Sequence, residues 1–107
     1  MDNEFRLDTS VSESGALVVR VTGELDMATS ELLSKTIVDW PDAVSECIVD
    51  LSDCSFVDSS GIRALLMSQR QLGDQGTLKL IGVIPYIERT LRIAGVQQVM
   101  EITSIGE

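Results

Sequence analysis

The sequence predicts an α/β domain in which a mixed sheet of four or five strands carries its helices on one face, as a two-layer sandwich. Segments with the apolar pattern of strands alternate along the chain with amphipathic helical segments, in the order β-β-α-β-α-β-α-β. Glycine, proline or small polar residues separate these segments. The chain of 107 residues is long enough for one domain with a core and too short for two. We therefore expect a single domain over residues 1–107.

The N-terminal part of the chain is predicted to form a hairpin over residues 4–22. Residues 5–8 alternate between apolar and polar side chains, as in a half-buried strand, and residues 16–21 are rich in β-branched side chains. The pair Ser14-Gly15 between them is a turn signal. We therefore expect the first two strands to be antiparallel. The later strands are joined through helices, so they are expected to be at least partly parallel.

A first helix is predicted over residues 27–40. Its apolar residues Leu33, Ile37 and Trp40 recur at helical spacing. The helix is expected to stop at Pro41, because proline disfavours the helical conformation in the residue before it.

A strand over residues 47–51 and a second helix are predicted next. The strand segment is almost continuously apolar, which is typical of a strand covered on both faces. The helix follows the sequence D-S-S-G at residues 58–61 and stops at Gly73. Its amphipathic pattern is carried by Ile62, Leu65, Leu66, Gln69 and Leu72.

The last part of the chain is predicted to contain a strand over residues 78–81, a third helix and a final strand. The helix follows Ile84, has Pro85 in its first turn and ends at Gly95. Its inward-facing residues are expected to be Ile87, Leu91 and Ala94. The final strand is expected over residues 99–102.

The charge of the chain argues against two classes of partner. The formal net charge is −9, whereas nucleic acids and anionic membranes require clustered Lys and Arg, so we expect neither as a partner. Residues 1–58 hold 13 acidic and 3 basic residues, and residues 59–107 hold 4 acidic and 5 basic residues. The acidic half is a solvated face, or it steers a partner that has a basic patch.

The composition also excludes several kinds of chemistry. The chain contains no histidine, which rules out Ser-His-Asp catalysis and histidine-ligated zinc. Cys47 and Cys54 are too far apart along an extended segment for a disulfide, since bridged Cα atoms lie within about 7 Å. We find no apolar run of membrane-spanning length and no signal-peptide pattern. We therefore expect a cytoplasmic protein without a metal site.

Two interpretations of the D-S-S-G segment remain open. Asp and Ser are typical caps of the free N–H groups at a helix start, so the segment is an N-cap. Alternatively, one serine hydroxyl is exposed where the helix N-terminus favours an anion such as phosphate. Serine catalysis is disfavoured, because no histidine base, G-x-S-x-G motif or glycine-rich cofactor loop occurs. If the serine takes part in chemistry, it is therefore expected to be a substrate and not a catalyst, and no catalytic residue or cofactor is expected.

Three segments of the chain resemble one known family. They are residues 21–29 (V-T-G-E-L-D-M-A-T), residues 48–62 with D-L-S and F-V-D-S-S-G-I, and residues 89–96 (R-T-L-R-I-A-G-V). In this order and spacing, and over nearly the whole chain, the sequence resembles the STAS domain of bacterial anti-sigma-factor antagonists. The family fold agrees with the two-layer sandwich predicted from the residues. Family members often carry a further helix after the last strand, for which only residues 103–107 remain.

The resemblance implies a regulatory binding protein and not an enzyme. In the family, the first serine of D-S-S-G is phosphorylated by an anti-sigma factor that is also a serine kinase and itself binds ATP and magnesium. The corresponding residue here is Ser59, with Ser60 as the fallback. The unphosphorylated antagonist binds the kinase and frees the sigma factor, the phosphorylated form dissociates, and a serine phosphatase resets the cycle. The chain is expected to be a monomer or a weak dimer.

Five residues are expected to contact this partner: Asp26, Thr29, Asp58, Ser60 and Gly61. The family uses an acidic residue at the position of Asp26 next to the phosphorylatable serine, and Asp26 is also a candidate N-cap of the first helix. Asp58 either caps the second helix or orients the hydroxyl of Ser59. Gly61 is expected to allow close packing or the approach of the partner.

Two other classes of function stay open. A non-phosphorylated STAS subunit, either a signalling scaffold or the accessory subunit of a lipid transporter, also suits the size and charge. A receiver-like phosphoacceptor at Asp50 or Asp53 would need an acidic metal-binding cluster and a lysine at a later strand end, whereas Lys79 lies within a predicted strand.

Overall fold

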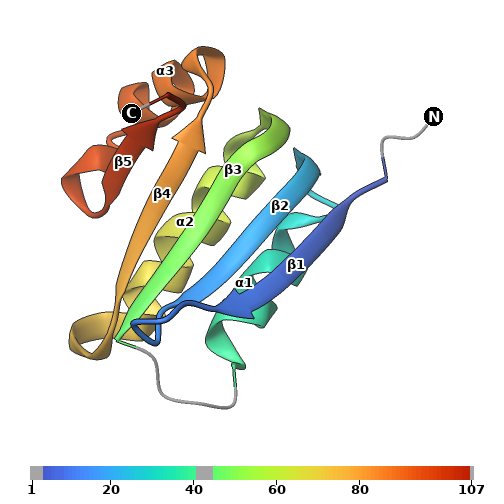
Figure 1. The fold of residues 1–107 in the computed structure, drawn as a ribbon. Coiled ribbons are helices and arrows are strands. Elements are labelled where there is room, and N and C mark those ends of the chain that lie inside the picture. Colours follow the sequence, from blue (N-terminus) through green and yellow to red (C-terminus); the bar gives the residue numbers. More distant parts are fainter. Residues whose placement is uncertain (1–3, 41–44, 107) are drawn as a thin grey trace.

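The computed structural model describes residues 4–40 and 45–106 (Figure 1). The strands are β1 (Arg6–Val11), β2 (Leu17–Leu25), β3 (Glu46–Val57), β4 (Thr77–Val83) and β5 (Glu101–Ser104). The helices are α1 (Ser30–Val38), α2 (Ser59–Leu72) and α3 (Pro85–Ile93), with short 3-10 turns at Gly73–Gln75 and Val96–Gln98.

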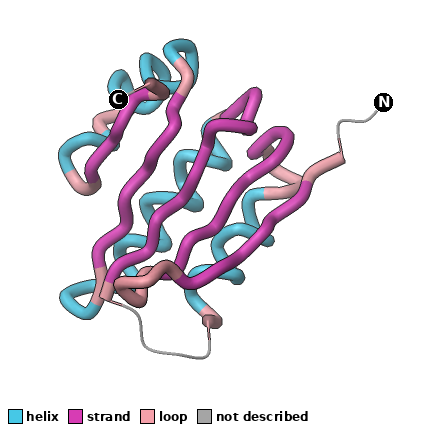
Figure 2. Tube along the Cα trace, viewed as in Figure 1, coloured by secondary structure: helices cyan, strands magenta, loops and turns pink. Residues whose placement is uncertain are grey.

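The strands form one mixed sheet with the spatial order β1-β2-β3-β4-β5. β1 and β2 are antiparallel, and every other neighbouring pair is parallel. Right-handed connections between parallel strands that advance in one direction place their helices on one face of the sheet. Figures 1 and 2 show α1 and α2 behind the sheet. The predicted two-layer α/β sandwich with a mixed sheet is therefore confirmed.

The hydrophobic core lies between the sheet and the helices. The strands contribute alternate residues, all fully buried: Leu17, Val19, Val21, Cys47, Val49, Leu51, Leu78 and Leu80. The helices add Leu33, Ile37, Leu65, Ile87 and Leu91 to the same cluster. All three helices therefore pack into the core, and these five residues are among those that the apolar spacing predicted for the inward faces of the helices.

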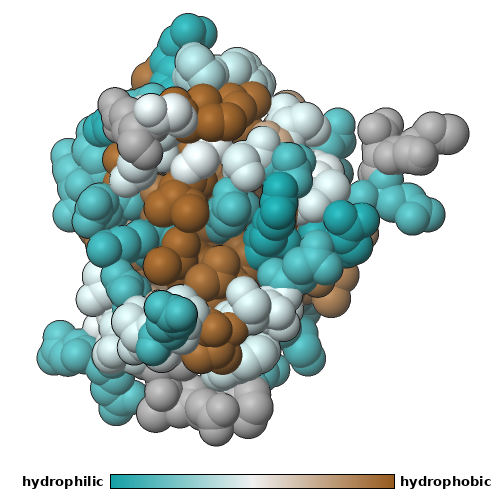
Figure 3. Space-filling view, viewed as in Figure 1, coloured by the Kyte–Doolittle hydropathy of each residue, from teal (hydrophilic) through white to brown (hydrophobic). Residues whose placement is uncertain are grey.

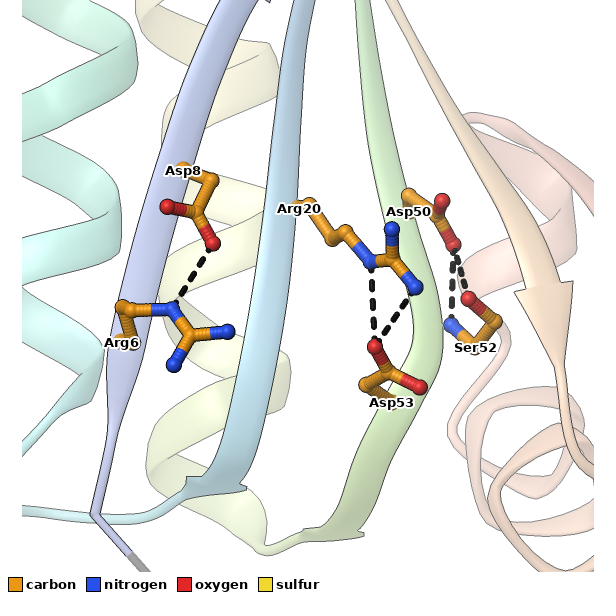
Figure 4. A network of polar contacts seen from close by, with 6 residues as sticks. All are labelled: Arg6, Asp8, Arg20, Asp50, Ser52 and Asp53. Atoms are coloured by element: carbon orange, nitrogen blue, oxygen red, sulfur yellow. Dashed lines mark hydrogen bonds and ion pairs between the residues drawn. The ribbon is translucent and has the colours of Figure 1, made fainter.

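None of the helices in residues 4–40 and 45–106 covers the other face of the sheet. Residues between the buried ones, such as Val18 and Ile48, are only partly buried. Figure 3 shows hydrophobic residues gathered in a band along the middle of this face. Ion pairs cross it: a carboxylate oxygen of Asp53 lies 2.7 Å from Nη2 of Arg20, on the neighbouring strand (Figure 4). We call this surface the open face.

β3 is longer than predicted and is covered on one face only. The apolar pattern indicated a strand over residues 47–51, whereas the strand extends to Val57. The pattern is nearly continuous because Ile48 adds an apolar side chain on the open face, and not because a second layer covers that face. The expectation of a strand buried on both faces is therefore wrong.

α1 begins three residues later than predicted, at Ser30. The residues before it, 26–29, form a hydrogen-bonded turn in which the N–H groups of Thr29 and Ser30 donate to the carbonyl of Asp26. Trp40 follows the end of the helix and is partly buried against the core. The predicted stop at Pro41 lies outside the described residues.

The C-terminal part also differs from the prediction in detail. Ile87 and Leu91 are fully buried, but Ala94 is exposed because it caps the C-terminus of α3 and lies beyond its inward face. The final strand is β5, two residues later than predicted, since the 3-10 turn Val96–Gln98 precedes it. None of the helices in the described part of the chain is long and apolar enough to cross a membrane.

Candidate functional site

Two loops meet at the edge of the sheet where β2 and β3 end. β2 ends at Leu25 and β3 at Val57, and these two residues are paired in the ladder. The N–H of Asp58 donates to the carbonyl of Leu25 at 3.1 Å. The structure therefore brings the loop that contains Asp26 next to the D-S-S-G turn. In open α/β sheets, functional groups collect at the carboxyl ends of parallel strands.

Asp58 caps the N-terminus of α2. Its Oδ1 accepts hydrogen bonds from the N–H groups of Ser60 at 2.8 Å and Gly61 at 3.1 Å. Its backbone is extended, as expected of a residue that precedes the first helical turn. The capping interpretation is thus confirmed. Within the described residues, the Asp58 carboxylate makes no hydrogen bond to the hydroxyl of Ser59, so its suggested role in orienting that hydroxyl has no support in this geometry.

Ser59 is the first residue of α2, and its side chain is exposed. Its hydroxyl has no hydrogen-bond partner among residues 4–40 and 45–106. Ser60, the fallback acceptor, is partly buried. The two serines therefore differ in access, and Ser59 is the more accessible to an enzyme. Ser59 thus lies at the N-terminus, the positive end, of a 14-residue helix.

Gly61 allows the start of α2 to pack directly on the end of β2. A Cβ atom at this position would lie 2.9 Å from Cγ1 of Val57 and 3.0 Å from the carbonyl oxygen of Leu25. Such distances are shorter than side chains tolerate, and the backbone carbonyl cannot rotate away. The close packing expected of this glycine is therefore present in the structure.

Asp26 and Thr29 hold the first loop together through reciprocal hydrogen bonds. Oδ1 of Asp26 accepts from the N–H groups of Ala28 at 3.0 Å and Thr29 at 3.1 Å. The hydroxyl of Thr29 accepts from the N–H of Asp26 at 2.9 Å and donates to the carbonyl of Glu24 at 2.6 Å. The N-cap position of α1 is Thr29, so Asp26 is not the cap of the helix; it stabilises the turn before it.

A groove of about 340 Å³ is lined by residues of α1 and α2 beside this site. It is lined by Ser30, Glu31, Ser34, Ser60, Arg63, Ala64, Met67 and Gln71. Met67 is 37% exposed, and Met27, in the loop before α1, is 82% exposed. The sequence alone did not single out Arg63 as a site residue, because it occupies an ordinary polar position of an amphipathic helix.

The residues that a receiver-like site would need are engaged elsewhere. Asp50 and Asp53 both lie on the open face, where Asp50 binds Ser52 and Asp53 binds Arg20 (Figure 4). Lys79 lies within β4, and its ammonium group is 2.9 Å from a carboxylate oxygen of Glu46. In the described part of the chain, Cys, Asp and Glu side chains form no group of three that could hold a metal ion.

Both cysteines are buried free thiols. Burial raises the pKa of Cys47 to about 12 and also raises the pKa of Cys54. A thiol held in its protonated form is a poor nucleophile and a poor metal ligand.

Comparison with known proteins identifies the family. The fold and the turn at the end of β3 are those of a small α/β domain that carries an accessible serine at a helix start. The family model described as "Mlab, STAS domain" matches residues 9–103. The chain therefore belongs to the STAS domain family.

Several similar proteins are named as antagonists of anti-sigma factors. The anti-sigma F factor antagonist of Paenibacillus polymyxa is 29% identical over 92 residues, which cover 82% of this chain and 78% of the relative. An anti-sigma factor antagonist from Mycobacterium paratuberculosis has a similar fold, with a TM-score of 0.84 at 23% identity over 96% of this chain and 88% of that one.

The Bacillus protein SpoIIAA is similar in both of its forms. Its unphosphorylated structure, titled as an anti-sigma factor antagonist, aligns with a TM-score of 0.68 at 26% identity, covering 92% of this chain and 86% of that one. Its phosphorylated structure aligns with a TM-score of 0.68 at 27% identity, covering 92% of this chain and 90% of that one.

Proposed function

We propose that this chain is an anti-sigma-factor antagonist that is controlled by phosphorylation of Ser59. The unphosphorylated form binds an anti-sigma factor that is also a serine kinase, and this binding frees the sigma factor. Phosphorylation ends the binding, and a serine phosphatase restores it. The observation that carries the proposal is the exposed hydroxyl of Ser59, which begins α2 and has no hydrogen-bond partner among the described residues.

The relatives support this proposal in two ways. Those described above are antagonists of anti-sigma factors by name, and SpoIIAA has been solved with and without phosphate. In the proposed cycle this chain is the substrate of phosphoryl transfer. The partner supplies the ATP and magnesium, so the chain itself needs no cofactor.

The charge of the phosphate accounts for the switch. A phosphate on Ser59 adds roughly 1.5 to 2 negative charges at neutral pH. The group would stand beside the carboxylate of Asp58 and the loop of Asp26, which both belong to the acidic residues 1–58. A partner surface that is complementary to the neutral hydroxyl of Ser59 would lose its contacts with this turn, and any acidic group on it would be repelled by the phosphate. The fold should survive, because Asp58 and not Ser59 caps α2.

Phosphate transfer to the serine is the first test. The purified chain is incubated with an anti-sigma factor kinase from its own organism, ATP and magnesium, and the phosphate is located by mass spectrometry. Trypsin leaves Ser59 and Ser60 on one peptide, between Lys35 and Arg63, so fragment spectra must assign the site. We expect one phosphate per chain, on Ser59.

Two alanine variants make the assignment specific. Ser59→Ala should accept no phosphate, whereas Ser60→Ala, its neighbour on the same helical turn, should still accept one phosphate per chain, on Ser59, even if the loss of a partner contact slows the transfer. Full phosphorylation of Ser59→Ala would show that Ser59 is not the acceptor.

Binding to the same kinase is the second test. Ser59→Asp places a permanent negative charge at the acceptor and should raise the Kd, while Ser59→Asn, of similar size and neutral, should raise it less. Equal affinities for the two variants would exclude the charge mechanism. If the wild-type chain neither binds such a kinase nor accepts phosphate, a non-phosphorylated scaffold or transporter subunit becomes the better assignment.

A further inference from the structure

β3 contains two extra residues relative to β2, and they set where the acceptor turn begins. The ladder pairs Arg20 with Asp50 but Thr22 with Asp53, and it shifts again between Gly23 and Glu24. Each shift is a β-bulge that inserts one residue into β3. Without the two bulges, Leu25 would pair with residue 55. With them it pairs with residue 57, and the D-S-S-G turn starts level with the end of β2.

The number of bulges matters as well as their presence. One extra residue turns every later side chain to the opposite face, and a second one turns it back. Buried residues of β3 accordingly change from a spacing of two, at Val49 and Leu51, to a spacing of three, at Cys54 and Val57. Val57 and Leu25 therefore both face the core at the start of the site.

The first bulge is held by the side chains of Asp50 and Ser52. Oδ1 of Asp50 accepts from the N–H of Ser52 at 2.9 Å and from its hydroxyl at 2.7 Å (Figure 4). The registered pairing of β3 with β4 ends at Asp50 and Ile81, so beyond this point the ladder of β3 runs along β2. The carboxylate thus supplies a partner for a backbone N–H at the place where the β4 ladder stops.

The facing residue of β4 fits this arrangement. Gly82 has a φ of +66°, and a Cβ there would lie 2.9 Å from Cβ of Ser52 and 3.0 Å from Oδ1 of Asp50. A larger residue would push on both partners of the bulge. Glycine at position 82 therefore allows β4 to pack closely against the bulge of β3.

We propose that Asp50 and Ser52 are positioning residues for the phosphoacceptor: by holding the first bulge, they set the register in which β3 delivers Ser59 to the end of β2. This inference rests on the proposed function for its consequence in phosphoryl transfer. The register itself is a property of the isolated chain and can be tested without a partner.

The partner-free experiment is amide hydrogen exchange by NMR. In Asp50→Ala, the amides of Ser60 and Gly61, which Asp58 holds in the wild type, should exchange at least fivefold faster. The matched control is Asp53→Ala, which removes a carboxylate from the same strand and the same face but breaks only an exposed ion pair; its exchange rates at these amides should stay within twofold of the wild type. Equal rates in Asp50→Ala and the wild type would overturn the proposal.

The second measurement is the rate of phosphate transfer to Ser59. Asp50→Ala should lower kcat/KM by about tenfold, since small misplacements of a reacting group have effects of this size. Asp50→Asn keeps an acceptor oxygen and should recover most of the rate. If Asp50 acted only through its negative charge, Asp50→Asn would not recover the rate. A rate for Asp50→Asn as low as that of Asp50→Ala would contradict positioning by the hydrogen bond.

Two further variants keep the test decisive if Asp50→Ala does not fold. Ser52→Ala removes one of the two hydrogen bonds, and Gly82→Ala disturbs the same bulge from β4. Both should speed exchange at Ser60 and Gly61, and wild-type rates in both would overturn the proposal. A wild-type chain that takes no phosphate on Ser59 would instead refute the proposed function, and the exchange rates would still decide the role of the bulge.

Discussion

At the scale of single residues, Gly61 decides how closely α2 approaches the sheet. Alanine is usually better than glycine inside a helix, by about 1 kcal/mol. Here the added methyl group would meet the carbonyl oxygen of Leu25 at 3.0 Å, and that oxygen belongs to a strand that cannot move without disturbing the core. The steric cost therefore exceeds the gain in helix propensity.

Gly61→Ala should lower the free energy of unfolding by about 1–3 kcal/mol, the usual cost of overpacking. The measurement is urea denaturation followed by circular dichroism. Ser60→Ala, one residue earlier in the same turn, serves as the control and should change stability by less than about 0.5 kcal/mol. A Gly61→Ala variant as stable as the wild type would mean that α2 can shift away from β2.

The residue scale also shows what could be predicted for the site. The cap at Asp58 followed from residue type and position alone, because Asp before an amphipathic segment is a strong local signal. The turn held by Asp26 and Thr29 did not follow, since its hydrogen bonds depend on a loop conformation that residue type does not fix. The spacing pattern therefore placed the start of α1 at Met27, three residues too early.

At the scale of elements, α3 is tied to β5 through one carboxylate. The hydroxyl of Ser104 and the guanidinium of Arg92 both donate hydrogen bonds to Glu88. These contacts, that of Ser104 first, lower the pKa of Glu88 below its usual value of 4.5. Because the ionised form is the one that is bound, the contact stabilises the fold at neutral pH and is lost as the pH falls through the lowered pKa.

Glu88→Gln should therefore reduce the acid sensitivity of the protein. The difference in urea midpoint between pH 7 and pH 3 should be smaller for Glu88→Gln than for the wild type. Glu13→Gln, which removes an exposed carboxylate from the turn between β1 and β2, should keep the full wild-type difference. If Glu88→Gln shows the same difference in urea midpoint between pH 7 and pH 3 as the wild type, the contact between α3 and β5 does not depend on the ionised carboxylate.

The elements were predicted best where their periodicity is regular. α2 and α3 have clear helical spacing and clear stop signals. In α3 the buried face agrees with the prediction except at Ala94, whereas in α2 only Leu65 of the predicted residues is fully buried and the other four are partly buried. β3 was predicted only as far as Leu51. Beyond Leu51 its two bulges change the spacing of buried residues from two to three, so the alternation that indicates a strand is lost. Bulges depend on the pairing partner, which local sequence does not reveal.

At the scale of the whole molecule, the strand order follows the order of the chain, so the sheet divides along the sequence. β1, β2, β3 and α1 belong to the acidic residues 1–58, and α2, β4, α3 and β5 to the nearly neutral remainder. Figure 1 shows β1 and β2 on one side of the sheet and β4 and β5 on the other, so the uneven charge of the sequence is also uneven across the sheet. The composition predicted the charge imbalance between the two parts of the chain, and the strand order of the sheet places these two parts on different sides of the molecule.

The two cysteines report on the stability of the whole domain. Both thiols lie in the core, and burial raises the pKa of Cys47 to about 12, so labelling requires unfolding. A thiol reagent at pH 8 should react with the folded chain at least about a hundredfold more slowly than with the chain in 8 M urea. The labelling is followed by absorbance, and Val38→Cys, at an exposed position on α1, provides the fast control. Rapid labelling of the wild-type chain would show that the core opens locally.

The cap at the start of α2 has a consequence for the reverse reaction of the proposed cycle. One oxygen of Asp58 already occupies the amides of Ser60 and Gly61, two of the donors with which a helix end commonly enfolds a bound anion. A phosphoryl group attached to the neighbouring hydroxyl would find those donors taken and would stay hydrated at the surface. Its hydrolysis would then require no opening of the domain, only access for the hydrolysing enzyme.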